Sequence, residues 1–191
     1  MLFEIENSKK EIFADLCHEL QRGALDRKHP FRFVVLSSSA GAGVDSRYVV
    51  VRKVEKDLQF FFFTDVRSTK INQLRKNPNV SLLFYHPQKR TQIRINGHAL
   101  LHHQNDLAKN LWRKVQNEAQ KSYNSKLAPG AEISDPHDAF YWQEDLSDSE
   151  NFCVIQIHPE QIEALQLNGL EHLRIYFERV NSVWEGKWLV P

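Results

Sequence analysis

Apolar and polar residues alternate in short runs along most of the chain, which is the spacing of half-buried β-strands. Short strands outnumber helices, and this balance indicates a small antiparallel barrel: a mainly β fold with flanking helices. The predicted strands are Phe31–Leu36, Arg47–Val54, Leu58–Thr64, Val80–Tyr85, Thr91–Leu101, Phe152–Ile157, Ile162–Leu167, Leu173–Glu178 and Val183–Leu189. We expect one domain over residues 1–191.

Helical spacing is confined to a few segments. Ser8 and Glu11 form a capping-box pattern ahead of apolar positions that recur every three or four residues, and Gly23 is a suitable stop. This predicts that residues 1–30 supply a helix packing on the body of the fold. The other predicted helices begin at Ser68 and at Asn105, the latter reaching Lys121, with a short one near Ala139–Glu144 inside a loop-rich excursion over 124–148.

Two segments lead to more specific expectations. Ser37–Ser46 is small, polar and contains two glycines, so it is predicted to be a loop, followed by a hairpin of Arg47–Val54 with Leu58–Thr64. The run Phe60–Phe63 predicts a strand buried on both faces, because strand side chains alternate between faces. Such a strand suits a closed barrel or a subunit contact, and we expect a homodimer with this run at or near the contact.

Charge and composition exclude several classes of protein. The 25 basic and 24 acidic residues give a net charge of +1, which argues against a general nucleic-acid binder. With two cysteines, no basic leader and no long apolar run, we expect a cytoplasmic protein without a membrane span. The nine histidines include no His-Glu-x-x-His pattern, and the adjacent His102 and His103 should point to opposite faces, so we predict no metal site.

A group of cations and hydroxyls could hold a phosphate. Arg47 opens one strand, and Ser68, Thr69 and Lys70 open the short helix. A guanidinium, an ammonium and the free N–H groups of a helix start are suitable partners for a mononucleotide phosphate. From spacing alone, a solvated arginine and an ordinary helix cap are favoured over a phosphate site.

The order of the motifs resembles the pyridoxamine 5'-phosphate oxidase family from about Phe31 to Pro191. That family has a strand Arg-x-Val-Leu-Leu-Lys, a Tyr-Thr pair, a Ser-Arg-Lys helix start, the phrase Asn-Pro-x-Val-x-Leu-Leu-Phe and a glutamine opening the next strand. The matching segments here are Arg47–Arg52, Phe63-Thr64, Ser68–Lys70, Asn77–Phe84 and Gln92, with Trp184–Pro191 resembling the family's C-terminus.

The resemblance implies a split β-barrel homodimer with FMN at the subunit interface. Arg47 and Lys70 would then hold the FMN phosphate, with Ser68 and Thr69 donating hydrogen bonds to it. Backbone of Tyr48, Val49, Val50 and Arg52, and of Phe63 and Thr64, would line the isoalloxazine ring, and Gln92 would hydrogen-bond to the flavin. No residue is assigned as catalytic acid or base.

The chain departs from the family pattern in both halves of the site, but the flavin half is mostly retained and the substrate half is mostly lost. Thr69 replaces the helix-start arginine, Arg52 replaces the strand-end lysine, and the C-terminal Arg-x-His is not met in Glu171–Ile175. We therefore expect an FMN-dependent oxidoreductase acting on a small substrate, with oxidation of pyridoxamine phosphate doubtful. The alternatives are a non-enzymatic flavin- or haem-binding protein and a deazaflavin-dependent reductase.

Overall fold

The computed structural model describes residues 1–116 and 118–191. Its strands are β1 (Phe33–Ala40), β2 (Gly43–Val50), β3 (Lys53–Val54), β4 (Phe60–Asp65), β5 (Asn79–His86), β6 (Thr91–His103), β7 (Phe152–Gln166), β8 (Leu173–Val180) and β9 (Val183–Leu189). Its helices are α1 (Lys9–Leu25), α2 (Thr69–Lys76), α3 (Asp106–Trp112) and α4 (Glu118–Lys121), with 3-10 turns at Pro30–Arg32 and Pro136–Phe140. None of these helices is long and apolar enough to cross a membrane.

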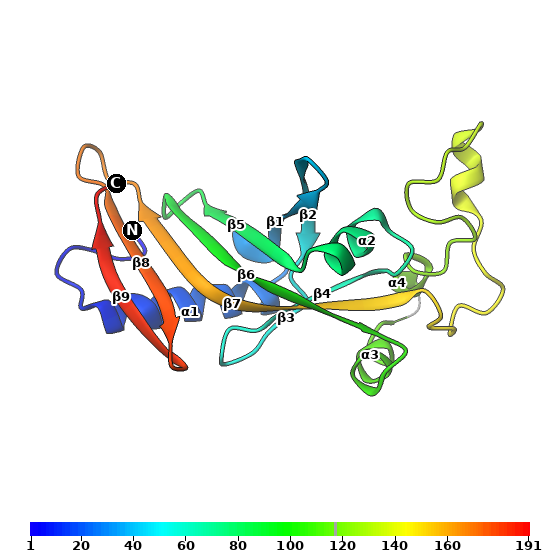
Figure 1. Cartoon of the computed structure of the whole chain (residues 1–191), viewed down its shortest axis with the longest axis horizontal. Coiled ribbons are helices and arrows are strands. Elements are labelled where there is room, and N and C mark those ends of the chain that lie inside the picture. Colours follow the sequence, from blue (N-terminus) through cyan, green and yellow to red (C-terminus); the bar gives the residue numbers. More distant parts are fainter. Residues whose placement is uncertain (117) are drawn as a thin grey trace.

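The strands form one antiparallel sheet in the order β2-β1-β5-β6-β7-β4-β3, and β8 and β9 extend it from β7. The long strand β7 pairs with β4 through its first half and with β8 through its second half. Figure 1 shows β6 and β7 running along the molecule, with α1 near the β8–β9 end and the 124–148 excursion at the other end. No ladder joins β2 to β4 within the described residues, so the sheet is a barrel left open on one side.

Gly97 explains how β6 and β7 stay together through a change of register. The pairing shifts between Asn96 and Gly97, and a Cβ on Gly97 would lie 2.1 Å from the carbonyl oxygen of His158. Only glycine allows the two backbones to approach this closely. The sequence predicted two strands where β7 is one continuous strand, because Pro159 lies inside it beside this irregularity.

The predicted loop over Ser37–Ser46 is wrong. These residues form the end of β1, a tight turn at Gly41 and the start of β2, and Ser37 pairs with Ser46. The hairpin predicted for Arg47–Val54 with Leu58–Thr64 is also wrong in its first half, because β2 pairs with β1 and only β3 pairs with β4. Serines continue the strand because their hydroxyls find partners: Ser38, which is buried, donates to Gln73.

The phenylalanine run is buried on both faces, as predicted, but by its own chain. Phe60 and Phe62 belong to the main core, whereas Phe61 packs on the opposite face in a second apolar cluster. That cluster also contains Ala108 and Trp112 of α3, Tyr123, Phe152 and Val154. Because α3 covers the second face, burial of this run does not require a subunit contact; a homodimer with the run at or near its contact stays a prediction.

The predicted N-terminal helix is confirmed. Ser8 and Glu11 make the capping box, and Phe13 packs on Phe177 and Trp184 of β8 and β9, which fixes α1 against the sheet. The helix predicted over 105–121 is instead two helices, α3 and α4, and residue 117 lies outside the described residues. The short helix expected near Ala139–Glu144 is a 3-10 turn a few residues earlier, capped by Asp135, whose side chain accepts a hydrogen bond from His137 N–H.

Candidate functional site

Most of the predicted site residues meet in one cavity on the open side of the barrel, which we call the seam cleft. It has a volume of about 260 Å³. Its lining residues are Arg47, Tyr48, Val49, Val50, Arg52, Phe62, Phe63, Thr64, Lys70 and Ile155. The strand β2 supplies one wall and β4 the other, while Lys70 enters from α2. Of the predicted residues, Ser68, Thr69 and Gln92 do not line this cavity.

Backbone groups of both walls face the cleft without ladder partners. Val51 N–H donates to Arg32 on the β1 side, and Arg52 N–H donates to Phe61 O of β4. Because N–H directions alternate along a strand, the backbone groups of Tyr48 and Val50 point away from β1, toward β4. By the same alternation Phe63 points its backbone groups toward β2. The cleft therefore offers hydrogen-bonding backbone on two sides, as a strand edge does.

Arg47 is held rigidly at one end of the cleft. Its Nη1 donates to Ser38 Oγ at 2.7 Å and to Leu36 O at 3.3 Å, and its Nη2 donates to Gln73 Oε1 at 3.0 Å. Nη2 also lies 2.6 Å from Asp45 Oδ2. The guanidinium is therefore oriented by two strands and by α2, which suits a residue that presents charge to a ligand.

Lys70 is the second cation of the cleft. Its Nζ donates to Thr64 Oγ1 at 3.0 Å, and it has no carboxylate partner within ion-pair distance in the described residues. Burial lowers the pKa of Lys70, and the nearby charge of Arg47 lowers it further. The two cations thus act on one another, and an anion between them would relieve their repulsion.

The hydroxyls at the start of α2 behave differently from the prediction. Ser68 is the N-cap residue by position, but its side chain makes no capping bond. It is buried, and its Oγ donates to Asp65 O at 2.7 Å. Thr69, at the first position of the helix, is exposed. A role for Ser68 in holding a phosphate would require its hydroxyl to leave Asp65.

Arg52 forms the rim of the cleft. Its guanidinium carbon lies 5.7 Å from the centre of the Phe63 ring, a cation–π arrangement. Tyr123, from the segment after α4, lies near Arg52; burial raises the pKa of Tyr123, and the positive charge of Arg52 opposes that rise. Tyr123 was not predicted from sequence, because it lies in a polar segment without strand or helix spacing.

Gln92 lies away from the cleft within one chain. It pairs with Tyr85 of β5 and Leu165 of β7, so β1 and β5 separate it from β2 in the sheet. The sheet face around it carries large exposed apolar side chains, namely Phe33, Tyr48, Leu83 and Tyr85. Tyr48, which is 75% exposed, belongs both to this face and to the seam cleft.

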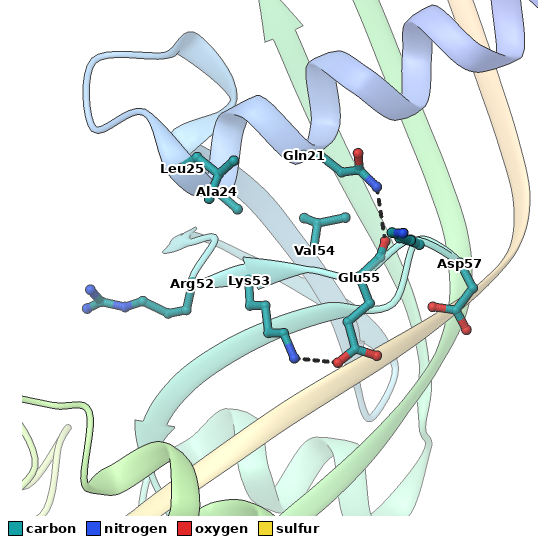
Figure 2. A pocket seen from close by; sticks show the side chains of 9 residues that line it. Gln21, Ala24, Leu25, Arg52, Lys53, Val54, Glu55 and Asp57 are labelled. Atoms are coloured by element: carbon teal, nitrogen blue, oxygen red, sulfur yellow. Dashed lines mark hydrogen bonds and ion pairs between the residues drawn. The ribbon is translucent and has the colours of Figure 1, made fainter.

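A larger cavity of about 610 Å³ lies between α1 and the β3–β4 turn. Figure 2 shows Leu25 and Ala24 on the helix side and the turn residues Glu55 and Asp57 opposite them. Gln21 Nε2 bridges to Glu55 O at 3.4 Å, and Lys53 pairs with Glu55. Arg52 borders both cavities, but the predicted phosphate-binding residues line only the seam cleft.

A buried group of titratable residues lies outside both cavities. Glu19 of α1 accepts a hydrogen bond from His29 Nε2 at 3.1 Å and pairs with Lys89 at 3.0 Å, with His86 Nε2 at 4.0 Å. Burial would raise the pKa of Glu19, but hydrogen bonds from Lys89, His29 and Arg22 and the charge of Lys89 outweigh it and lower the pKa to about 2.

The geometry of this group disfavours a metal ion, although three potential ligand atoms lie within 4.8 Å of one another. The Nδ1 atoms of His29 and His86 accept backbone N–H bonds from Phe31 and Lys89. A neutral ring then carries its proton on Nε2, the atom that a metal would need bare. The group is better described as a hydrogen-bonded ion pair that joins α1 to the barrel.

Comparison with known proteins agrees with the fold. Residues 24–166 match the family described as pyridoxamine 5'-phosphate oxidase. A pyridoxine/pyridoxamine 5'-phosphate oxidase of Legionella pneumophila is 29% identical over 189 residues, covering 87% of this chain and 81% of the relative.

Two solved structures share the architecture. A pyridoxamine 5'-phosphate oxidase-related, FMN-binding protein from Nostoc punctiforme superimposes with a TM-score of 0.78 at 22% identity, covering 98% of this chain and 100% of that one. PhzG from Burkholderia lata gives a TM-score of 0.75 at 20% identity, with 100% and 98% coverage. These likenesses identify the open barrel as the FMN-binding split β-barrel fold, and the family match over residues 24–166 shows that the chain belongs to the pyridoxamine 5'-phosphate oxidase family.

Proposed function

We propose that the chain binds FMN in the seam cleft and is an FMN-dependent oxidoreductase acting on a small substrate. The observation that carries this proposal is the convergence of Arg47 and Lys70 with the free backbone of β2 and β4 in one cavity. These groups come from three separate elements, β2, β4 and α2, so a common role explains their meeting better than separate structural roles do.

The chemistry of the cleft fits the two ends of FMN. Arg47 and Lys70 present positive charge and N–H donors to a phosphate. The backbone groups of Tyr48, Val50 and Phe63 match the donors and acceptors on the edge of an isoalloxazine ring, while Val49 and Ile155 supply apolar surface. The lysine and the arginine would bind the single phosphate of a mononucleotide. A dinucleotide usually requires a glycine-rich loop as well, and no glycine is among the described residues that line the cleft.

The cleft residues would bind and orient rather than exchange protons. No histidine, carboxylate or cysteine is among the described lining residues. When bound, the flavin supplies the redox chemistry, and the protein supplies binding, orientation and electrostatics. The Arg52–Tyr123 pair at the rim would define the side from which a substrate approaches the ring.

A homodimer would bring Gln92 to the cofactor. Gln92 is two strands away from the cleft within one chain, yet it shares a sheet face with exposed Tyr48, Leu83 and Tyr85. In an isologous dimer built on this face, the same surface of each subunit meets its copy. Gln92 of each subunit would then approach Tyr48 at the mouth of the other subunit's cleft.

The direct test is the absorbance spectrum of the purified protein, followed by titration of the apo-protein with FMN and FAD. We expect a flavin spectrum and tighter binding of FMN, because the two cations of the cleft suit the terminal phosphate of a mononucleotide. Tighter binding of FAD, or saturation by neither flavin, would refute the proposal. A haem band in the spectrum would favour a cofactor-storing or sensing protein instead.

A further inference from the structure

Asp45 is the carboxylate that pairs with Arg47. Its Oδ2 lies 2.6 Å from Arg47 Nη2 and accepts a hydrogen bond from Gln73 Nε2 at 3.0 Å. Its side chain is 48% exposed, whereas that of Arg47 is 20% exposed. An anion that approaches Arg47 Nη2 therefore meets a carboxylate that is already paired with it.

The other donors on the two Nη atoms of Arg47 are also engaged. Nη1 donates to Ser38 and Leu36, and Gln73 Oε1 shares Nη2 with Asp45. A phosphate that binds through Nη2 must therefore displace Asp45 or lie beside it. Two anions at one guanidinium repel each other, so either outcome costs binding free energy.

The charge at this end of the cleft is small. Arg47 and Lys70 are positive and Asp45 is negative, which leaves one net positive charge among the three side chains, and the charge of Asp45 also acts on Lys70. Asp65 nearby is paired with Arg67 and adds no net charge. A phosphate monoester carries about −1.5 to −2 charges at neutral pH, so the cations do not neutralise it.

Resting on the proposed flavin site, we propose that Asp45 is an internal substitute for the cofactor phosphate. When no cofactor is bound, it holds Arg47 in place, and when FMN enters, it competes with the phosphate. The phosphate then contributes less to affinity than it would at an arginine without Asp45, so the preference for FMN over riboflavin is smaller than the two cations alone would give. Asp45 does not line the cleft but acts on it through Arg47, with Gln73 positioning both side chains.

The test is Asp45→Asn, which keeps an oxygen for Gln73 and Arg47 but removes the charge. We expect FMN to bind about three- to tenfold more tightly, the size of one partly exposed charge interaction, while riboflavin binding changes by less than about twofold. Asp57→Asn is the matched control, because it removes the same formal charge from the exposed β3–β4 turn, away from Arg47. Flavin fluorescence titration gives all of the dissociation constants.

A second measurement separates this inference from the flavin proposal. Inorganic phosphate should raise the melting temperature of Asp45→Asn more than that of the parent chain or of Asp57→Asn, whether or not flavins bind. If FMN binds the parent chain but Asp45→Asn binds it no more tightly, the role of Asp45 is refuted while the flavin site stands. If no variant binds a flavin but phosphate stabilises Asp45→Asn selectively, the anion site stands and the flavin proposal fails.

Discussion

Arg52 and Phe61 are joined by a backbone hydrogen bond of 2.9 Å, and it marks the point beyond which β2 and β4 separate. On one side of it, β3 and β4 continue as a ladder. On the other side, the strand edges of Tyr48, Val50 and Phe63 face a cavity instead of each other. One hydrogen bond thus sets where sheet pairing ends and where ligand-binding backbone begins.

The two cations of the seam cleft should each contribute to FMN affinity. Arg47→Ala and Lys70→Ala should weaken binding by about ten- to a hundredfold, because a charge-assisted hydrogen bond contributes roughly 1.5–3 kcal/mol. Lys76→Ala is the matched control, since Lys76 is an exposed cation at the other end of α2. Unchanged dissociation constants in both cleft variants, with melting temperatures near that of the parent chain, would place the phosphate elsewhere.

Most of the residues that the sequence grouped together do line one cavity, whereas several of the strands around them were predicted wrongly; the role of these residues in binding FMN stays a prediction. Sequence motifs identified Arg47, Lys70 and the Phe63-Thr64 pair, and the structure brings these residues together in the seam cleft. The pairing of β2 with β1 was missed, because the serines of that hairpin have the composition of a loop and are ordered by partners such as Gln73, far away in sequence. Tyr123 and Asp45 were missed for the same reason: their roles depend on contacts that no local pattern records.

Glu19 should link stability to pH. Its pKa is lowered to about 2 from an ordinary 4.5, so its contribution is complete above pH 4.5 and is lost as the pH falls toward 2. The shift corresponds to about 3 kcal/mol. Urea denaturation at pH 7 should therefore give Glu19→Gln a free energy of unfolding lower than that of the parent chain by roughly this amount. Below pH 4.5 the difference between the two free energies should shrink.

Glu6→Gln is the control for that experiment, because Glu6 is exposed and has no ion pair among the described contacts. A free-energy difference between Glu19→Gln and the parent chain that stays constant from pH 7 to pH 3 would show that the carboxylate charge is not what stabilises α1 against the barrel.

The exposed sheet face should be the dimer contact. Tyr85→Glu places a charge among Phe33, Tyr48 and Leu83, and in an isologous contact the two introduced charges lie on facing surfaces. We expect sedimentation to show a dimer for the parent chain and a species of 22.4 kDa for the variant, with FMN bound at least about tenfold more weakly because Gln92 of the partner is lost. Leu170→Glu introduces the same charge at a fully exposed turn, and this variant should neither dissociate the dimer nor weaken FMN binding. A dimeric Tyr85→Glu would exclude this face.

Pyridoxamine phosphate should reduce the bound flavin slowly. The Arg-x-His motif of the family is absent from the matching segment, and the nearest arginine in sequence is Arg174. Its Nη2 is already engaged, because it donates to Glu163 at 2.9 Å, and the same carboxylate oxygen accepts a hydrogen bond from Arg94 at 2.8 Å. His172 lies beside Arg174 in a separate cavity of about 270 Å³. A substrate without its orienting groups is misplaced against the ring, and an error of about 1 Å can cost on the order of a hundredfold in rate.

Anaerobic stopped-flow spectroscopy measures this reaction directly, with dithionite as the control that shows the flavin to be reducible. We expect fast bleaching with dithionite and little bleaching with micromolar pyridoxamine phosphate over the same time. Rapid bleaching with micromolar pyridoxamine phosphate would mean that Arg174 leaves Glu163 when the substrate arrives. In that case Glu163→Gln, which weakens the hold on Arg174, should accelerate the reaction further, and the chain would be a vitamin B6 oxidase despite its altered C-terminal motif.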